Sequence, residues 1–266
     1  MEKIPADCPQ VEIQTGEITY TFPQGGWEDW GGKVAKGAII EALERSNVGV
    51  HSDFTGRCDG PTSDTMERKA PICYRQRGDT IQVYAWGERA HEHIRLIAQH
   101  VRALWVPSRE EGERINDSEK RYTIVPVRIG TCTFRQEIVG FPSKKVAESG
   151  AGWSEYETVS PIWPPKNAKY QRPKVGTPAH HAWMGSVIAG SIRELLAGAG
   201  LKEERVHVDL VRWKHVPAMR FERDRPGVRE DCDGVHARFV TNALLPDGWP
   251  VGARGADGYG EIRRCL

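Results

Sequence analysis

The chain has 266 residues, of which 39% are hydrophobic and 27% are charged; these proportions are typical of a globular protein and exclude a disordered or fibrous one. Its formal net charge of +1 is too small to indicate a nucleic-acid partner by itself. No apolar run reaches the roughly 18 residues of a transmembrane helix, so we expect no membrane partner.

The six cysteines, at positions 8, 58, 73, 132, 232 and 265, include no CxxC pair. Their spacing favours neither a zinc site nor a disulfide framework, which indicates reduced thiols. The N-terminus lacks the apolar segment of a signal peptide. We therefore expect a cytoplasmic protein with no metal and no cofactor.

Residues 1–141 are predicted to form the first domain. Alternating apolar residues predict a strand from Val11 to Phe22, and apolar residues at helical spacing predict a helix from Val34 to Leu43. Arg77-Gly78-Asp79 predicts a hairpin turn between two short strands. An apolar stripe from Ala90 to Trp105 predicts a second helix.

Two further strands, Tyr122 to Ile129 and Cys132 to Val139, are expected to be joined by a turn at Gly130. Two polar segments, His51 to Lys69 and Ser108 to Lys120, are expected to be loops. The resulting order of strand, helix, hairpin, helix and strand is the split βαβ pattern of a ferredoxin-like (RRM-like, βαββαβ) domain.

Residues 142–266 are predicted to form a second, modified ferredoxin-like domain. Thr177-Pro178 predicts the start of a helix, with threonine as the N-cap and proline at the first helical position. A proline- and arginine-rich excursion is expected from Pro217 to Gly227. The expected strands are Glu155 to Trp163, Val206 to Trp213 and Val235 to Leu245. The predicted fold class is therefore α+β, with two ferredoxin-like domains in tandem.

A glycine-rich run near the C-terminus, from Trp249 to Ile262, is expected to form a loop. Glycine permits positive φ angles and the close approach of a ligand to backbone amides, so such a loop is suited to holding phosphates. The alternative is a connection before a last strand, because the spacing matches neither the Walker loop nor the dinucleotide fingerprint. The glycines of the run are Gly252, Gly255, Gly258 and Gly260.

Four short motifs resemble those of a known family. The segment from Gly255 to Ile262 is similar to the family's final glycine loop and strand, and Val159-Ser160-Pro161-Ile162 is similar to its strand entering the second domain. Arg128-Ile129-Gly130 before a strand, and Ala70-Pro71-Ile72-Cys73-Tyr74 leading to a strand and a helix, have the same character. With its two ferredoxin-like halves, the chain resembles the RAMP superfamily, and most closely its CRISPR repeat-RNA processing endoribonucleases.

The resemblance implies a metal-independent endoribonuclease that binds a CRISPR repeat stem-loop, cuts it and leaves a 5′-hydroxyl and a 2′,3′-cyclic phosphate. The family often places a catalytic histidine just after the first helix, a place that His51 occupies. Lys36 and Arg57 are candidates for offsetting the negative charge of the transition state. Without the resemblance, His51 would be interpreted as a loop histidine with no function, and Lys36 and Arg57 as surface residues.

The resemblance also implies RNA contacts in the second half of the chain. Arg254 and the amides of the four glycines are the first candidates, and Tyr259 is a candidate for stacking on a base. Residues 141–266 hold 19 Lys and Arg against 15 Asp and Glu, whereas residues 1–140 hold 18 against 21. The other candidates in this basic half, whose alternative is a set of solvated charges, are Lys144, Lys145, Arg220, Arg223, Arg225 and Arg229.

Two other functions remain open. The chain could be a catalytically silent RAMP subunit that binds guide RNA among other CRISPR effector subunits, and it would then not need His51. It could also be a small-molecule enzyme or a regulatory protein on the same scaffold, because a fold does not fix a function. The histidines of the second helix, His91, His93 and His100, are expected to face solvent, since their spacing does not converge on a metal.

Overall fold

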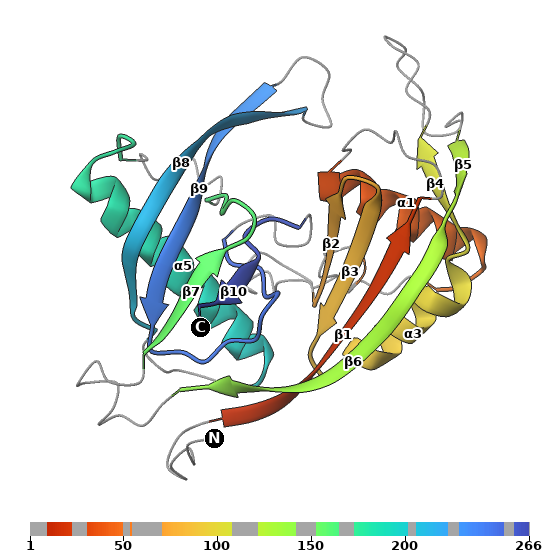
Figure 1. Cartoon of the computed structure of the whole chain (residues 1–266), viewed down its shortest axis with the longest axis horizontal. Coiled ribbons are helices and arrows are strands. Elements are labelled where there is room, and N and C mark those ends of the chain that lie inside the picture. The colour runs from red at the N-terminus through yellow and green to blue at the C-terminus, as the bar shows by residue number, and fades with distance from the viewer. Residues whose placement is uncertain are drawn as a thin grey trace, which may run out of the picture. The chain divides into compact units, whose positions relative to one another are not determined.

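The computed structural model describes residues 10–22, 31–49, 54, 71–107, 122–141, 153–164, 173–201, 206–222, 229–252 and 258–265. They form a mixed α/β fold with few helices and antiparallel sheets (Figure 1). The chain divides into two compact units. The N-terminal unit comprises Gln14–Gln136 with Ala256–Gly258, and the C-terminal unit comprises Met1–Ile13, Glu137–Gly255 and Tyr259–Leu266.

The N-terminal unit contains a four-stranded sheet with two helices on one face. The strand order is β2-β3-β1-β6, so β2 and β6 are the edge strands. Strand β3 pairs antiparallel with both β1 and β2. The strands are β1 (Gln10–Thr21), β2 (Ile72–Arg77), β3 (Thr80–Trp86) and β6 (Arg128–Gly140), and the helices are α1 (Gly31–Arg45) and α3 (Ala90–His100). The first four residues of β1 and the last four of β6 belong to the C-terminal unit.

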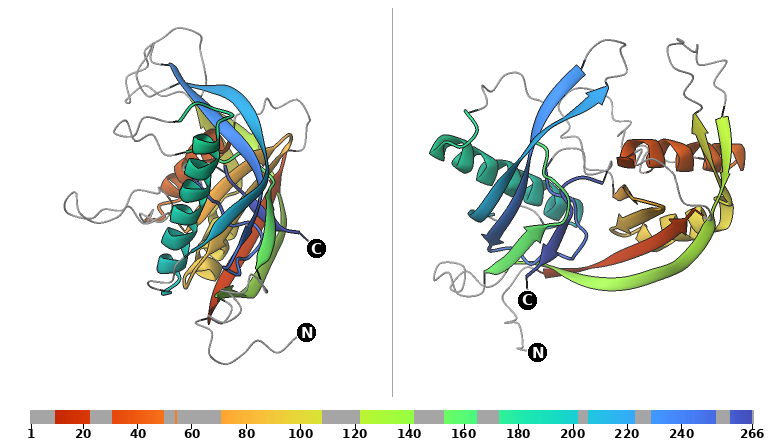
Figure 2. Two further views of the ribbon diagram at one scale, coloured as in Figure 1. Left: turned by 90° about the vertical axis from the view of Figure 1, so that its left-hand side faces the viewer. Right: turned by 45° about the horizontal axis from the view of Figure 1, so that its top comes forward.

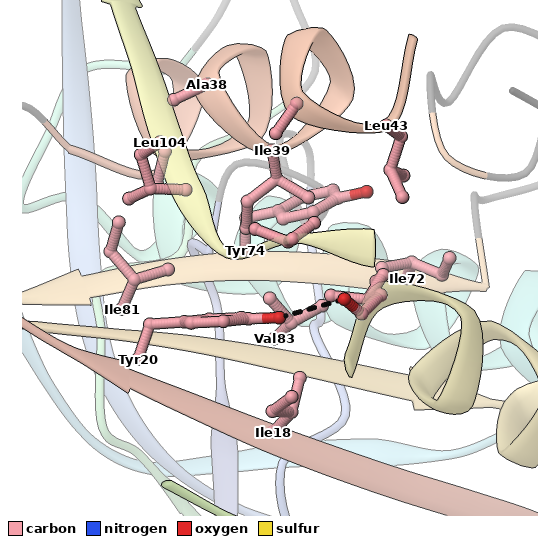
Figure 3. Packing of buried hydrophobic residues seen from close by; sticks show 14 of the residues in the cluster. Ile18, Tyr20, Ala38, Ile39, Leu43, Ile72, Tyr74, Ile81, Val83 and Leu104 are labelled. Carbon is pink, nitrogen blue, oxygen red and sulfur yellow. Dashed lines mark hydrogen bonds between the residues drawn. The ribbon is translucent and has the colours of Figure 1, made fainter. Parts of the chain in front are cut away.

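One hydrophobic core fills the space between these helices and the sheet (Figure 3). It forms because the apolar stripe of each helix and alternate residues of each strand point to the same side. Each large apolar side chain buried there contributes about 1.5–3 kcal/mol. The hydroxyl of Tyr20 donates to the Ile97 carbonyl at 3.1 Å, which satisfies a polar atom inside the core. Residues labelled in Figure 3 include Ile18, Ile39, Leu43, Ile72, Tyr74, Ile81 and Val83.

The second helix is shorter than the sequence predicts. Helix α3 ends at His100, and Val101 takes an extended conformation. Leu104 and Trp105 lie in β4 (Ala103–Pro107), which pairs antiparallel with β5 (Tyr122–Pro126). Leu104 fits the helical stripe that precedes it, and it also fits the alternating burial of a strand, so the two periods could not be separated by pattern alone.

The predicted turn at Gly130 is also wrong, because β6 runs straight through this residue. A β-carbon on Gly130 would lie 3.0 Å from the carbonyl oxygen of Thr19 in β1. The glycine therefore allows a close approach between two strands rather than a change of direction. The break between β5 and β6 falls instead at Val127, directly after Pro126.

The C-terminal unit contains a second four-stranded sheet, in the order β10-β7-β9-β8, with one helix across a face (Figures 1 and 2). The elements are β7 (Ser154–Thr158), α5 (Pro178–Gly198), β8 (Val208–Glu222), β9 (Arg229–Thr241) and β10 (Ile262–Arg264). The predicted helix start is confirmed: the Thr177 hydroxyl accepts the amide of His180 at 3.2 Å, and Pro178 is the first helical residue. None of the described helices is long and apolar enough to cross a membrane.

The predicted excursion after residue 217 is largely a two-stranded ribbon. Strand β8 continues to Glu222, and its partner β9 begins at Arg229. The register shifts between Val216 and Met219, where Pro217 lies. Proline has no amide for the ladder, so a bulge absorbs it without ending the strand.

Candidate nucleic-acid interface

Tyr74 on the edge strand β2 holds the one described residue of the polar segment 51–69. Its hydroxyl donates to the carbonyl oxygen of Phe54 at 3.2 Å, and both residues are buried. The Phe54 ring meets the ring of His93 edge to face, with centroids 5.0 Å apart. The chain is therefore anchored three residues after His51 in the sequence.

The environment of His93 corrects the expectation that the histidines of α3 face solvent, because its side chain is only 1% exposed. His91 is half-buried, and its Nε2 lies 3.1 Å from the carbonyl oxygen of Thr15 in β1. The His91 ring also packs against Phe134 of β6. Both histidines therefore pack against other residues of the N-terminal unit.

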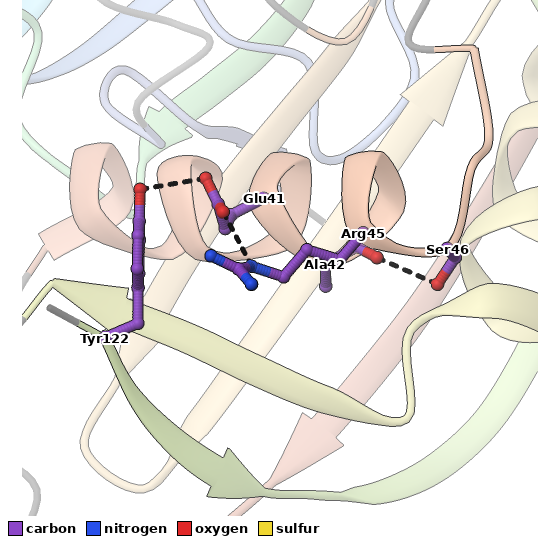
Figure 4. Close-up of polar contacts among 5 residues, drawn as sticks. All are labelled: Glu41, Ala42, Arg45, Ser46 and Tyr122. Carbon is purple, nitrogen blue, oxygen red and sulfur yellow. Dashed lines mark hydrogen bonds and ion pairs between the residues drawn. The ribbon is translucent and has the colours of Figure 1, made fainter. Parts of the chain in front are cut away.

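The C-terminal end of α1, which precedes His51 in the chain, is held by the polar contacts drawn in Figure 4 and by a contact of Arg45 with an aromatic ring. Glu41 accepts hydrogen bonds from Arg45 Nε at 2.7 Å and from the Tyr122 hydroxyl at 2.9 Å. The Arg45 guanidinium lies 4.0 Å from the centre of the Trp105 ring, within the range of a cation–π contact. This cluster ties α1 to the β4–β5 hairpin.

The glycine-rich loop also reaches β2, at Gly258. A β-carbon on this residue would overlap the carbonyl oxygen of Tyr74, and φ is +86°. Only glycine combines this φ angle with so close an approach to another backbone. Tyr74 thus contacts the loop through its carbonyl and Phe54 through its hydroxyl.

Two glycine amides of the loop donate within the protein. The amide of Gly252 donates to Ser191 Oγ at 2.8 Å, and the amide of Gly260 donates to the Pro161 carbonyl at 2.9 Å. A β-carbon on Gly260 would overlap the carbonyl oxygen of Val251. These two glycine amides therefore help to fold the loop.

Tyr259 packs against another side chain of the protein. Its ring meets the buried Trp163 ring edge to face, with centroids 5.7 Å apart, and the side chain is half-buried. This contact gives Tyr259 a structural role, and its stacking on a base stays a prediction.

The face of the C-terminal sheet opposite α5 carries four basic residues, Arg212, Lys214, His236 and Arg238, which we term the basic ladder. Arg212 is opposite Arg238 in the β8–β9 register, and Lys214 is opposite His236. Trp213, between the two β8 members, packs 5.4 Å from His180 on α5. Since successive side chains of a strand point to opposite faces, Arg212 and Lys214 point away from the helix, and both are exposed.

A carboxylate on β7 offsets part of this charge. Arg238 binds Glu155 through two hydrogen bonds, of 2.6 and 3.0 Å. These bonds, followed by the charges of Arg238 and Arg212, lower the pKa of the Glu155 carboxyl. The same bonds are the main cause of the raised pKa of Arg238. The cations farthest from β7 are therefore Arg212 and Lys214 on β8, the edge strand.

The basic ladder was not predicted from the sequence. The sequence does contain a pattern that could have predicted it, since basic residues lie two positions apart in each strand, at 212 and 214 and at 236 and 238. A structural alternative also exists, because charged residues on an edge strand prevent pairing with another sheet. The ladder is thus a candidate anion-binding surface, and protection of the edge strand is the alternative explanation for its charges.

Two of the arginines predicted to contact RNA, Arg220 and Arg229, lie on the ribbon beyond the ladder. In the β8–β9 register, Arg220 is opposite Asp231 and Arg229 is opposite Glu222. Arg223 and Arg225 lie outside the described residues.

Several other predicted residues also lie outside the described part of the chain, namely His51, Arg57, Lys144, Lys145, Arg254 and Gly255. Lys36 is described, on α1. Nine residues separate it from Arg45, which places it roughly 14 Å along the helix axis from the end that precedes His51. Within the described ranges, no three His, Cys, Asp or Glu residues are grouped so that they could hold a metal ion.

No family model and no curated protein matches this sequence. Solved structures match it over nearly its whole length. A crystal structure of Cas6b aligns with a TM-score of 0.65 and 13% sequence identity, covering 96% of this chain and 100% of that chain. A crystal structure of the CRISPR RNA processing endoribonuclease Cas6b aligns with a TM-score of 0.53 and 13% identity, covering 95% and 100%. The resemblance inferred from the sequence is therefore confirmed as a shared fold.

Proposed function

We propose that this protein is a metal-independent endoribonuclease that binds CRISPR repeat RNA, cuts it once in each repeat and stays bound to the processed guide. The observation that carries the proposal is the meeting of two segments at Tyr74. Phe54, three residues after His51, and Gly258 of the glycine-rich loop both contact this residue. The shared fold with a CRISPR RNA processing endoribonuclease supports the same function.

The proposed reaction is attack of a ribose 2′-oxygen on the adjacent phosphorus. A general base accepts the 2′-hydroxyl proton, the bond from phosphorus to the 5′-oxygen breaks, and a general acid protonates that leaving oxygen. The products are a 2′,3′-cyclic phosphate and a 5′-hydroxyl. His51 is assigned one of the two proton transfers, because imidazole titrates near neutral pH. Arg57 and Lys36 are assigned to the charge on the phosphorane.

RNA binding is assigned to the C-terminal half. Arg254, Gly255 and Gly258 would contact the backbone beside the cut. The basic ladder would hold another stretch of phosphates, together with the arginines of the ribbon and with Lys144 and Lys145. Electrostatic contacts of this kind supply most of the affinity of proteins for nucleic acids, whatever the sequence.

The two sheets support a tandem ferredoxin-like architecture, with domains at residues 1–141 and 142–266. In chain order, the strand orders β6-β1-β3-β2 and β10-β7-β9-β8 both read fourth, first, third, second. The first sheet has a helix after its first strand and another after its third. The second sheet has only α5 among its described elements, so it corresponds to a shortened copy.

The test is incubation of the purified protein with a CRISPR repeat transcript in EDTA. We expect one cut per repeat, with a 2′,3′-cyclic phosphate on the upstream product and a 5′-hydroxyl on the downstream product. A transcript with a 2′-deoxy nucleotide at the cut position should bind equally and stay intact. Binding without cutting of the all-ribose transcript would instead favour the silent RAMP subunit.

A further inference from the structure

Described residues on both sides of His51 have fixed places within the N-terminal unit. Before it, α1 closes with the amide of Val48 donating to the Leu43 carbonyl at 3.1 Å, and Asn47 takes a φ of 56°. Three residues after His51, Phe54 is buried, at 1% exposure. The chain between these fixed points contains the candidate catalytic histidine.

Phe54 is held both through its ring and through its backbone. The ring packs against His93, and the carbonyl accepts the Tyr74 hydroxyl. The hydrogen bond is the more specific of the two, because it fixes the position of the main chain itself. Burial raises the pKa of the Tyr74 hydroxyl, so this group remains a proton donor throughout the pH range of an assay.

We propose that Tyr74 is a positioning residue for His51, acting through the carbonyl of Phe54. Three residues of chain span at most about 11 Å, so the position of the Phe54 backbone limits where the histidine can lie. A misplacement of about 1 Å at a reacting group can cost on the order of 100-fold in rate. The inference rests on the proposed endoribonuclease function.

The chain offers a matched control in Tyr20. This residue is also fully buried in the same core, and its hydroxyl also donates to a backbone carbonyl, that of Ile97 at 3.1 Å (Figure 3). The carbonyl belongs to helix α3 rather than to the segment after His51. Tyr74→Phe and Tyr20→Phe therefore remove the same group from comparable surroundings, and only the first releases Phe54.

The experiment measures single-turnover cleavage of a repeat transcript at saturating protein. We expect Tyr74→Phe to reduce the rate roughly 10- to 100-fold with unchanged RNA affinity, and Tyr20→Phe to cut at the wild-type rate. Both variants should melt lower by a similar amount, roughly 2–6 °C. In a His51→Ala background, Tyr74→Phe should cause no further loss, because residues that act as a unit are not additive.

Amide hydrogen exchange in the peptide covering residues 48–57 provides a readout independent of activity. It should be faster in Tyr74→Phe and unchanged in Tyr20→Phe. The inference is overturned by normal cleavage in Tyr74→Phe, by equal losses in the two tyrosine variants, or by a full additional loss on top of His51→Ala. If the wild type binds RNA without cutting it, the proposed function fails, and unchanged exchange in Tyr74→Phe would then refute the anchor itself.

Discussion

Gly258 and Tyr74 approach each other so closely that no side chain fits at position 258. A β-carbon there would overlap the Tyr74 carbonyl oxygen and lie 3.1 Å from the Cα atom of Arg75. The opposing atoms belong to the backbone of a sheet, so they cannot turn aside as the end of a flexible side chain can. The glycine-rich loop therefore takes this place on β2 only with glycine at position 258.

We predict that Gly258→Ala weakens RNA binding and cleavage more than it weakens the fold. The added methyl group, together with the φ of +86°, should push the loop away from β2. Binding titrations and thermal melts of the same preparations would measure both effects. The control is Gly37→Ala on α1, where a β-carbon meets nothing within 4 Å and alanine should stabilise the helix by about 0.5–1 kcal/mol. Normal RNA binding by Gly258→Ala would leave the loop with a structural role only.

The sequence predicted those elements in which burial follows a single period. Strand β1, helix α1 and the start of α5 at Thr177 are of this kind, because each is specified by residues close together in the chain. Prediction failed where a residue's role depends on a distant partner. Gly130 was interpreted as a turn, and its reason for being glycine is Thr19 on the neighbouring strand.

The same limit applies to the candidate interface. Phe54 is one aromatic residue in a polar segment, and nothing local indicates that Tyr74, 20 residues later, will hold it. Arg212 and Arg238 become neighbours only through the β8–β9 register. Contacts between residues far apart in the chain depend on how the elements pack, and a single sequence does not show this packing.

The basic ladder should contribute to RNA affinity through its charge. We predict that Arg212→Ala and Lys214→Ala each reduce the slope of log affinity against log salt by about 0.7–0.9, the value for one phosphate contact. Cleavage at saturating protein should be unchanged. Arg193→Ala removes the same charge from the exposed side of α5, the helix on the opposite face of the sheet, and should leave the slope unchanged. If the ladder only protects a strand edge, the two ladder variants will bind with the wild-type slope and aggregate more readily.

The stability of the C-terminal unit should respond to acid through Glu155. Hydrogen bonds from Arg238 lower the pKa of this carboxyl below the ordinary value of about 4.3. Because the folded-state pKa is the lower one, the stabilisation is present above the unfolded-state value and is lost as the pH falls through the folded value. Urea unfolding between about pH 3 and 8 should therefore show a smaller loss in acid for Glu155→Gln than for the wild type. Arg238→Gln should have the same effect, and a wild-type acid profile in either variant would contradict the assignment.

The cluster around Arg45 should stabilise the N-terminal unit (Figure 4). We predict that Arg45→Ala lowers the free energy of unfolding by about 1 kcal/mol, since it removes the contact with the Trp105 ring and the ion pair with Glu41. Arg45→Lys should not restore it fully, because an ammonium cannot stack as a planar guanidinium does. Denaturant titrations of the three proteins would show this order, and equal stability of all three would mean that the cluster contributes nothing measurable.

The last prediction concerns His51 and distinguishes an enzyme from a silent subunit. We expect His51→Ala to bind repeat RNA with nearly the wild-type affinity while single-turnover cleavage falls at least about 100-fold, since a positioned general acid or base contributes about 10²–10⁴. A histidine that moves a proton in the transition state adds little to ground-state binding, so the loss belongs to the cleavage step. Arg57→Ala and Lys36→Ala are the matched alternatives. Normal cleavage by His51→Ala with a slow Arg57→Ala would transfer the catalytic role to the arginine, and a slow Lys36→Ala would require the RNA to reach the N-terminal half of α1. An unimpaired His51→Ala enzyme would also remove the reason for the Tyr74 effect, so the two experiments constrain each other.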